Sequence, residues 1–173
     1  FRGCFNYLSL THDSINEMEN ILDAYKALYE LKVNKLIKAV GVGSKDWLII
    51  KELSEYIDFD WVMFANKFTI YHHPKEIVDF IEFLHKKGTG IINSAVFNAG
   101  FLTGGDYFDY KKTNRDDPSW KKLFEWRDKF HRICKNYAIK PSDACIIFSI
   151  SHPAISGIAL NTSHPDKMPA NVD

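Results

Sequence analysis

The feature that most constrains the fold is a regular alternation of short apolar runs with longer segments of helical periodicity. The apolar runs have the length of strands and cover residues 5–11, 37–43, 60–65, 90–96 and 155–160. The segments with helical spacing of apolar residues cover 17–32, 46–56, 74–87, 119–137 and 142–151. Strands that are apolar throughout and separated by helices are typical of an α/β fold whose parallel sheet is covered on both faces.

Two architectures satisfy this pattern. Five parallel strands can form an open, doubly wound sheet of the flavodoxin-like kind, or they can be five of the eight units of a (β/α)8 TIM barrel. Periodicity alone does not separate them. With 173 residues and no linker, low-complexity tract or internal repeat, we expect residues 1–173 to form one domain. Because the chain begins with Phe1 and reaches an apolar run almost at once, we expect it to be cut from something longer.

Composition excludes several classes of protein. Hydrophobic residues make up 46% and charged residues 25%, which is globular composition. Lys and Arg balance Asp and Glu at 22 each, so we expect no nucleic-acid partner and no attraction to an anionic membrane. No apolar run approaches the roughly 18 residues of a membrane span, and no signal peptide opens the chain, which predicts a cytoplasmic protein. The three cysteines, Cys4, Cys134 and Cys145, lack metal or disulfide spacing and are predicted to be buried small hydrophobes.

Polar residues that directly follow the predicted strands are the candidate functional residues, because parallel α/β folds bind ligands at the carboxyl ends of their strands. They are His12 and Asp13, Gly43 and Ser44, Asn66 and Lys67, Ser94 and Asn98, and residues 161–163. We expect all of them on one rim.

The segment from Asn161 to Lys167 is the strongest anion site on physical grounds. Ser163 can cap a helix, Pro165 suits its first turn, and the free N–H groups, together with Lys167, favour a phosphate. An ordinary capped surface helix is the competing interpretation.

Other motifs are weaker. His12 is either a general acid or base or a structural histidine. His72 and His73 lack metal-ligand spacing, so no metal site is predicted. The glycine-rich segment 100–105 can bring backbone close to a ligand, although it is not a phosphate-binding P-loop. The polar, glycine-rich stretch up to about residue 118 is expected to be an irregular loop that includes Lys111 and Lys112, and the aromatic residues of 120–130 are expected to be core.

Four segments carry a resemblance to a known family. They are NYLSLTHD (6–13), AYKALYELKVNKLIKAVGVGS (24–44), INSAVFNAGFLTGG (92–105) and SHPAISGIALNTSHPDKMPANV (151–172). In this order and spacing they resemble the aldo/keto reductases, in particular the branch with plant L-galactose dehydrogenase and bacterial L-fucose and D-threo-aldose 1-dehydrogenases. The resemblance implies a (β/α)8 barrel, of which residues 1–173 correspond to about units four to eight and form a single partial domain.

The resemblance also implies roles for individual residues. His12 falls on the histidine of the family's catalytic tetrad, and Ser94 lies near the position that contacts the nicotinamide. The loop beside the pyrophosphate matches Phe97, Asn98, Gly100 and Leu102, while Thr162 and Ser163 match contacts on the 2′ side of the adenosine ribose. Lys167 matches a basic position that selects the cofactor, and Asn171 matches an adenine contact. Ser44 and Asn161, from the same predicted rim, complete the expected cofactor-binding set.

The implied function is an NAD- or NADP-dependent oxidoreductase that transfers hydride between nicotinamide and a carbonyl or sugar C1 carbon, oxidising an aldose to a lactone. The tetrad also needs a tyrosine, a lysine and an aspartate, and no segment here matches them. The alternative is therefore a catalytically incomplete half-barrel that binds a nucleotide or a protein partner. Such a half-barrel would expose sheet edges and self-associate. An unrelated flavodoxin-like binding domain is the third hypothesis, and a reversal in the strand order would reveal it.

Overall fold

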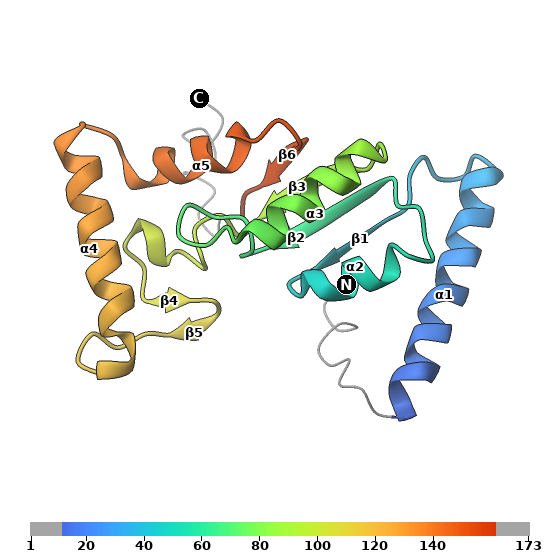
Figure 1. Cartoon of the computed structure of the whole chain (residues 1–173), viewed down its shortest axis with the longest axis horizontal. Coiled ribbons are helices and arrows are strands. Elements are labelled where there is room, and N and C mark those ends of the chain that lie inside the picture. Colours follow the sequence, from blue (N-terminus) through green and yellow to red (C-terminus); the bar gives the residue numbers. More distant parts are fainter. Residues whose placement is uncertain (1–11, 162–173) are drawn as a thin grey trace.

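The computed structural model describes residues 12–161, with side chains from residue 18 onward. This part of the chain contains five α-helices, six strands and two short 3-10 helices (Figure 1). In chain order the elements are α1 (His12–Val33), β1 (Gly41–Ser44), α2 (Trp47–Leu53), β2 (Trp61–Ala65), α3 (Lys75–Lys86), β3 (Gly90–Ser94), η1 (Phe101–Thr103), β4 (Tyr107–Phe108), β5 (Lys111–Lys112), η2 (Pro118–Trp120), α4 (Lys121–Asn136), α5 (Pro141–Ser151) and β6 (Gly157–Ala159).

The main sheet has four parallel strands in the order β1-β2-β3-β6. Along the described strands the order runs in one direction, without the reversal that marks a doubly wound sheet. A one-way order of parallel strands joined by helices is the arrangement within an arc of a (β/α)8 barrel. The structure thus favours the barrel over the flavodoxin-like alternative.

Helices α2 and α3 cover one face of this sheet (Figure 1). On α3 the apolar residues Ile77, Phe80, Ile81 and Leu84 recur at helical spacing, and all four are buried. They pack in the main core against Val42, Val62, Phe64 and Ile91 of the strands and Ile50 and Leu53 of α2. The residues that the sequence pattern places inside α3 are therefore confirmed as core.

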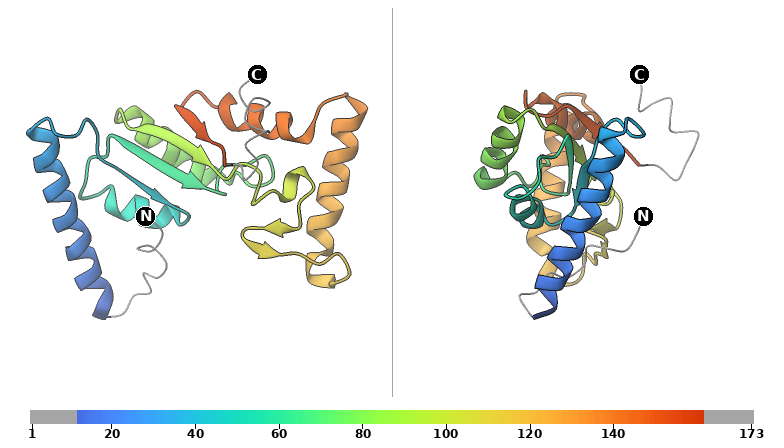
Figure 2. Two further views of the ribbon diagram at one scale, coloured as in Figure 1. Left: turned by 180° about the vertical axis from the view of Figure 1, so that it is seen from behind. Right: turned by 90° about the vertical axis from the view of Figure 1, so that its right-hand side faces the viewer.

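The opposite face of the sheet differs from the expectation that both faces are covered. Along β2 and β3, buried residues alternate with half-exposed ones, and Gly43 of β1 is exposed. Seen from behind, the strands lie in front of α3, and within residues 12–161 no helix covers this side (Figure 2). The half-exposed face includes Trp61, Met63 and Ile92, so it is apolar without being enclosed in this part of the chain.

A second core lies beyond the carboxyl end of β3 and joins the first part of the stretch expected to be irregular to α4 and α5. It contains Phe101, Leu102, Leu123, Phe124, Phe130, Cys134 and Cys145. Strands β4 and β5 form a small antiparallel hairpin here, so Lys111 and Lys112, although exposed, are a strand and not a loop. Both described cysteines are free and buried, as predicted; burial, with a smaller effect of nearby Cys134, raises the pKa of Cys145 to about 12. Cys4 lies outside the described residues.

Element boundaries differ from the sequence pattern most clearly at the starts of α1 and β1. Helix α1 begins at His12, five residues before the predicted start, and the predicted strand 5–11 lies outside the described residues. Strand β1 begins at Gly41 and not near residue 37, because the chain ahead of it is held by a side chain. The Asp60 carboxylate accepts hydrogen bonds from the Val40 N–H at 2.7 Å and from Lys32 Nζ at 2.6 Å. The last predicted helix, which starts within 161–167, also lies beyond the described residues.

Candidate functional site

The carboxyl ends of the parallel strands form one edge of the sheet, here called the carboxyl edge. The register pairs Ser44 of β1 with Phe64 of β2, and Ala65 of β2 with Ser94 of β3. Ser94 Oγ donates a hydrogen bond to the Phe64 carbonyl at 2.9 Å, and the Asn66 N–H donates to the Ser94 carbonyl at 3.2 Å. The structure therefore brings Ser44, Asn66 and Ser94 to one edge, as the sequence pattern predicted.

Ser44 also shapes the start of the following helix. Its hydroxyl oxygen accepts a hydrogen bond from the Asp46 N–H at 3.0 Å, and the Asp46 carboxylate caps α2 by accepting from the Leu48 N–H. This arrangement fixes the turn between the carboxyl end of β1 and α2, and it leaves Ser44 buried at the edge.

The segment after β3, residues 97–105, is an unusual turn that we call the glycine turn. Asn98, Ala99 and Gly100 are consecutive residues with positive φ, at 47°, 59° and 90°. The Gly100 and Leu102 N–H groups both donate to the Phe97 carbonyl, and the Gly105 N–H donates to the Gly100 carbonyl at 2.9 Å. Left-handed backbone at Asn98 and Ala99 costs on the order of 1–3 kcal/mol each, and such strain is concentrated at ligand-binding sites.

Asn98 also has a buried amide oxygen without a hydrogen bond among the described residues. The residue is 2% exposed, and the atom concerned is Oδ1. The same is true of Asn66 Oδ1 at the end of β2, in a residue that is 3% exposed. A buried acceptor without a partner costs about 1–3 kcal/mol. These acceptor oxygens lack a hydroxyl or N–H donor. The ribose hydroxyls and the carboxamide of a nicotinamide dinucleotide are donors of this kind, so the two residues fit such a ligand.

Two side chains of α4 donate hydrogen bonds to backbone carbonyls of the glycine turn. Arg127 Nη1 donates to the Gly105 carbonyl at 2.9 Å and to the Phe101 carbonyl at 3.3 Å, and His131 Nε2 donates to the Leu102 carbonyl at 2.8 Å. Burial, with a smaller effect of Arg115, lowers the pKa of Arg127. Neither residue is among the candidates predicted from the sequence. Arg127 lies within the apolar stripe that runs through Leu123, Phe130 and Cys134, but a charged residue at such a position is normally assigned to the surface.

The tip of the β4–β5 hairpin, Asp109 and Tyr110, forms a second contact with the carboxyl edge. Asp109 accepts a hydrogen bond from Asn66 Nδ2 and forms a 3.1 Å ion pair with Lys45, the residue after β1. The Lys45 ammonium also lies 5.5 Å from the centre of the Tyr110 ring. Neither Lys45 nor Asp109 is among the candidates predicted from the sequence, although Lys45 directly follows the predicted rim residue Ser44.

The other predicted site residues are placed as follows. His12 is the first residue of α1, but its side chain lies outside the described part, as do Thr162, Ser163, Lys167 and Asn171 entirely. Asn161 is exposed two residues after β6. Phe97 is partly buried against the second core. Leu102 is fully buried there, and its N–H and carbonyl are both bonded within the protein.

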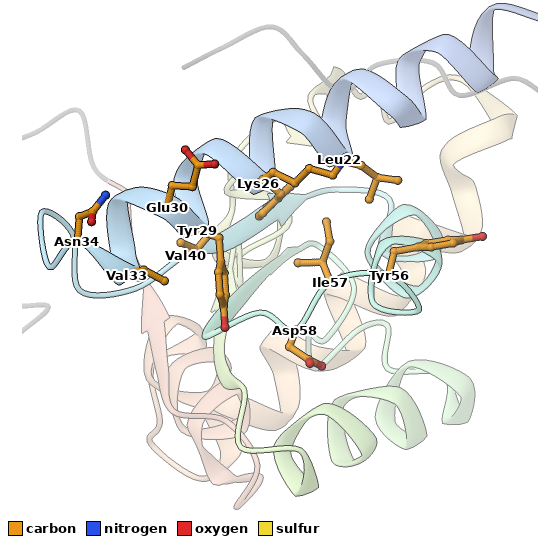
Figure 3. Close-up of a pocket in the computed structure, with 11 residues that line it drawn as sticks. Leu22, Lys26, Tyr29, Glu30, Val33, Asn34, Val40, Tyr56, Ile57 and Asp58 are labelled. Atoms are coloured by element: carbon orange, nitrogen blue, oxygen red, sulfur yellow. The ribbon is translucent and has the colours of Figure 1, made fainter.

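A separate cavity of about 880 Å3 lies at the opposite edge of the sheet (Figure 3). Its lining comes from α1, from Val40 just before β1, and from the residues before β2, including Tyr56 and Asp58. Tyr25 lines it as well, and its hydroxyl donates to the Gly41 carbonyl at 2.7 Å. Burial raises the pKa of Tyr25 to about 12. This tyrosine therefore lies at the edge of the sheet opposite Ser44, Asn66 and Ser94.

Two further properties concern the described residues only. Between residues 12 and 161, no helix has both the length and the apolar character needed to cross a membrane. Within the same part of the chain, His, Cys, Asp and Glu side chains form no group of three suited to a metal ion.

Comparison with known proteins gives consistent results. Residues 7–173 match the aldo/keto reductase family. Pyridoxal 4-dehydrogenase of Microbacterium luteolum is 29% identical over 152 residues, which are 86% of this chain and 42% of that protein. D-threo-aldose 1-dehydrogenase of Pseudomonas sp is 22% identical over 156 residues, covering 88% and 46% of the two chains. The chain thus spans a little under half the length of these curated relatives, and the family match confirms the resemblance of its motifs: it belongs to the aldo/keto reductase family.

Proposed function

We propose that this chain provides the cofactor-binding edge of an NAD(P)-dependent oxidoreductase that transfers hydride between nicotinamide and a carbonyl or sugar C1 carbon. The observation that carries the proposal is the glycine turn directly after β3. It places the strained, buried Asn98, whose amide oxygen has no hydrogen-bond partner between residues 12 and 161, in the loop that follows Ser94 at the carboxyl edge. Strain and an unsatisfied polar atom in one loop favour a bound ligand as the missing partner.

The substrate class is proposed from chemistry shared by two relatives. One is named for acting on pyridoxal and the other on D-threo-aldoses. Both compounds carry an aldehyde carbon that can close onto a hydroxyl group as a hemiacetal. We propose oxidation of such a hemiacetal carbon, with an aldose going to its lactone. The C–H hydrogen leaves as hydride and the O–H hydrogen leaves as a proton.

The bound nicotinamide would supply the hydride-accepting centre, and the chain's own residues would bind and orient. Ser44 and Ser94 lie at the carboxyl ends of β1 and β3, on either side of β2. Ser94 is on the half-exposed face of the sheet, where its small side chain would leave room for a flat ring. Asn98 and Gly100 would line the pyrophosphate, and Asn161, Thr162, Ser163, Lys167 and Asn171 the adenosine end. His12 would hold the substrate oxygen by a hydrogen bond. The proton acceptor is not assigned to a residue of this chain.

The proposal is tested by replacing His12 in the full-length protein. We expect His12→Asn to lower the turnover of aldose or pyridoxal oxidation by about 100-fold or more, while the dissociation constant for the dinucleotide changes little. The matched control is His85→Asn, which alters an exposed histidine in the last turn of α3. Unchanged turnover in the His12 variant contradicts the role of His12. A wild-type protein that binds neither NADH nor NADPH contradicts the proposed function as a whole.

A further inference from the structure

A charged side chain is buried beneath the glycine turn at a position where α4 otherwise presents apolar residues. Arg127 is 8% exposed, and its guanidinium carbon lies 4.2 Å from the centre of the Phe101 ring and 4.7 Å from that of Phe124. Its hydrogen bonds go to the carbonyls of Phe101 and Gly105. Burying a guanidinium group is unfavourable unless its charge is compensated, so a buried Arg127 lowers the stability of the fold, which points to another role for this residue.

Among the described residues Arg127 has no ion-pair partner, and Asp128 and Asp106 act on it only through Coulomb attraction without direct contact. The nearest candidate on the same helix, Asp128, is engaged by Arg115 through two hydrogen bonds of 2.8 and 2.9 Å. Carbonyl dipoles and aromatic faces hold the guanidinium in place but leave its net positive charge. In a partly buried setting this charge is screened less than a surface charge would be.

Arg127 and His131 also determine which way the peptide groups of the turn face. The carbonyls of Phe101, Leu102 and Gly105 all point toward α4. Carbonyl oxygens are the negative ends of their peptide dipoles, and an anion is repelled by them. Directing three of them onto α4 removes their repulsion from the side of the turn that faces away from this helix.

We propose that Arg127 is a positioning residue for the pyrophosphate of the dinucleotide: it fixes the glycine turn through two carbonyls, and it provides on the α4 side of the turn a positive charge that has no ion pair among the described residues. The inference rests on the proposed function, because it concerns the same cofactor site. Helix α4 thereby takes part in anion binding, although Arg127 lies 22 residues after Gly105 and 26 residues after Phe101 in the chain.

The test compares ligands with and without a pyrophosphate. In the full-length protein, we expect Arg127→Gln to weaken binding of ADP-ribose by about tenfold or more in isothermal titration calorimetry, while adenosine binding stays within about twofold. Arg127→Lys retains the charge but cannot hold both carbonyls as a fork, and an intermediate loss is expected. The turnover number at saturating dinucleotide should change far less than the dissociation constant.

The matched control is Arg115→Gln. Arg115 lies over the same Phe124 ring, at 4.5 Å, but pairs with Asp128 at the surface and has no hydrogen bond to the turn. The Arg115→Gln variant removes the same charge from the same region of the protein. ADP-ribose binding should remain close to that of the wild type, because Arg115 donates its hydrogen bonds to Asp128 and not to the turn. Hydrogen exchange of the amides in 100–105 gives a second readout, and we expect it to rise in Arg127→Gln and not in Arg115→Gln.

Several outcomes overturn the inference. Unchanged ADP-ribose binding in Arg127→Gln does so, and so does an equal loss for ADP-ribose and adenosine, because that pattern indicates general collapse of the site. If Arg127→Gln does not fold, Arg127→Lys decides: wild-type binding of ADP-ribose with unchanged exchange of 100–105 would show that the fork is not needed. A wild-type protein that binds no dinucleotide contradicts the proposed function, whereas wild-type binding that ignores Arg127 contradicts only this inference.

Discussion

Asn66 Nδ2 lies 2.6 Å from Asp109 Oδ1, which joins the residue after β2 to the tip of the β4–β5 hairpin, 43 positions further along the chain. Lys45, which follows β1, pairs with the other oxygen of the same carboxylate. One side chain therefore connects the hairpin to the ends of two neighbouring strands. The hairpin has only two residues in each strand, so its position depends on such contacts.

Replacing Asp109 should loosen the hairpin without unfolding the protein. Asp109→Asn keeps an oxygen for Asn66 and tolerates the φ of 52°, but it loses the ion pair with Lys45. Asp109→Ala loses both contacts. We expect amide exchange in 107–112 to rise slightly in Asp109→Asn and strongly in Asp109→Ala, with a loss of less than about 1 kcal/mol in unfolding free energy from the ion pair.

Asp58→Asn serves as the control for these variants. It breaks the 2.9 Å Asp58–Lys87 ion pair, which lies ahead of β2 at the amino end of the strand. Exchange of the hairpin should not respond. Wild-type exchange of 107–112 in Asp109→Ala would show that the hairpin is held by other contacts.

A methyl group at Gly41 should be poorly tolerated. A Cβ atom at this position would collide with the side chain and the carbonyl of Trp61 on the neighbouring strand. We expect Gly41→Ala to lower the unfolding free energy by about 1–3 kcal/mol, because strand and ring must shift to admit it. Gly157→Ala in β6, where nothing lies within 4 Å of the added atom, is the control and should be close to neutral. Urea unfolding measures both, and equal effects would contradict the role given to Trp61.

The Asp60–Lys32 contact predicts a specific pH dependence. The hydrogen bond from Lys32, and a smaller contribution from the Val40 N–H, lower the pKa of Asp60 in the folded state. A carboxyl whose pKa is lowered by folding stabilises the protein above its unfolded pKa of about 4, and this contribution disappears as pH falls through the folded pKa. We expect Asp60→Asn to reduce the unfolding free energy at pH 7.

The difference between the wild type and Asp60→Asn should shrink as pH falls below about 4 and vanish below the lowered folded pKa of Asp60, because the wild-type carboxyl then becomes neutral as well. Asp79→Asn, which removes the exposed pair with Lys75, is the control. A difference between wild type and Asp60→Asn that persists unchanged to pH 2 would mean that the contact acts through packing and not through charge.

Much of the sheet and its covering helices follows from the sequence. Strands β2 and β3 were predictable as short, continuous apolar runs, and helix α3 was predictable from the helical spacing of Ile77, Ile81 and Leu84. The position of Ser44, Asn66 and Ser94 at one edge was predictable for a different reason. Consecutive parallel strands joined by helices must all end on the same side.

The second core and its hairpin were not predictable in the same way. Strands of two residues, such as Tyr107–Phe108, are too short to show an alternation of apolar and polar residues. Their position is set by Asp109 and its distant partners. Arg127 was hidden because a charged residue in an apolar stripe is normally assigned to the surface. Its burial depends on carbonyls of a turn more than 20 residues away, which no local pattern contains.

We propose that the carboxyl edge and the glycine turn bind a nicotinamide dinucleotide. Fluorescence titration of the full-length protein with NADH and with NADPH, alongside Asn98→Asp and the exposed control Asn114→Asp, tests it most directly. We expect saturable binding of at least one dinucleotide, and we expect its oxidised form to reverse this binding. Binding should be lost in Asn98→Asp, because a carboxylate at position 98 would repel the pyrophosphate, and it should be retained in Asn114→Asp. Saturable binding of neither dinucleotide to the wild type, or equal binding to Asn98→Asp, would contradict the proposal.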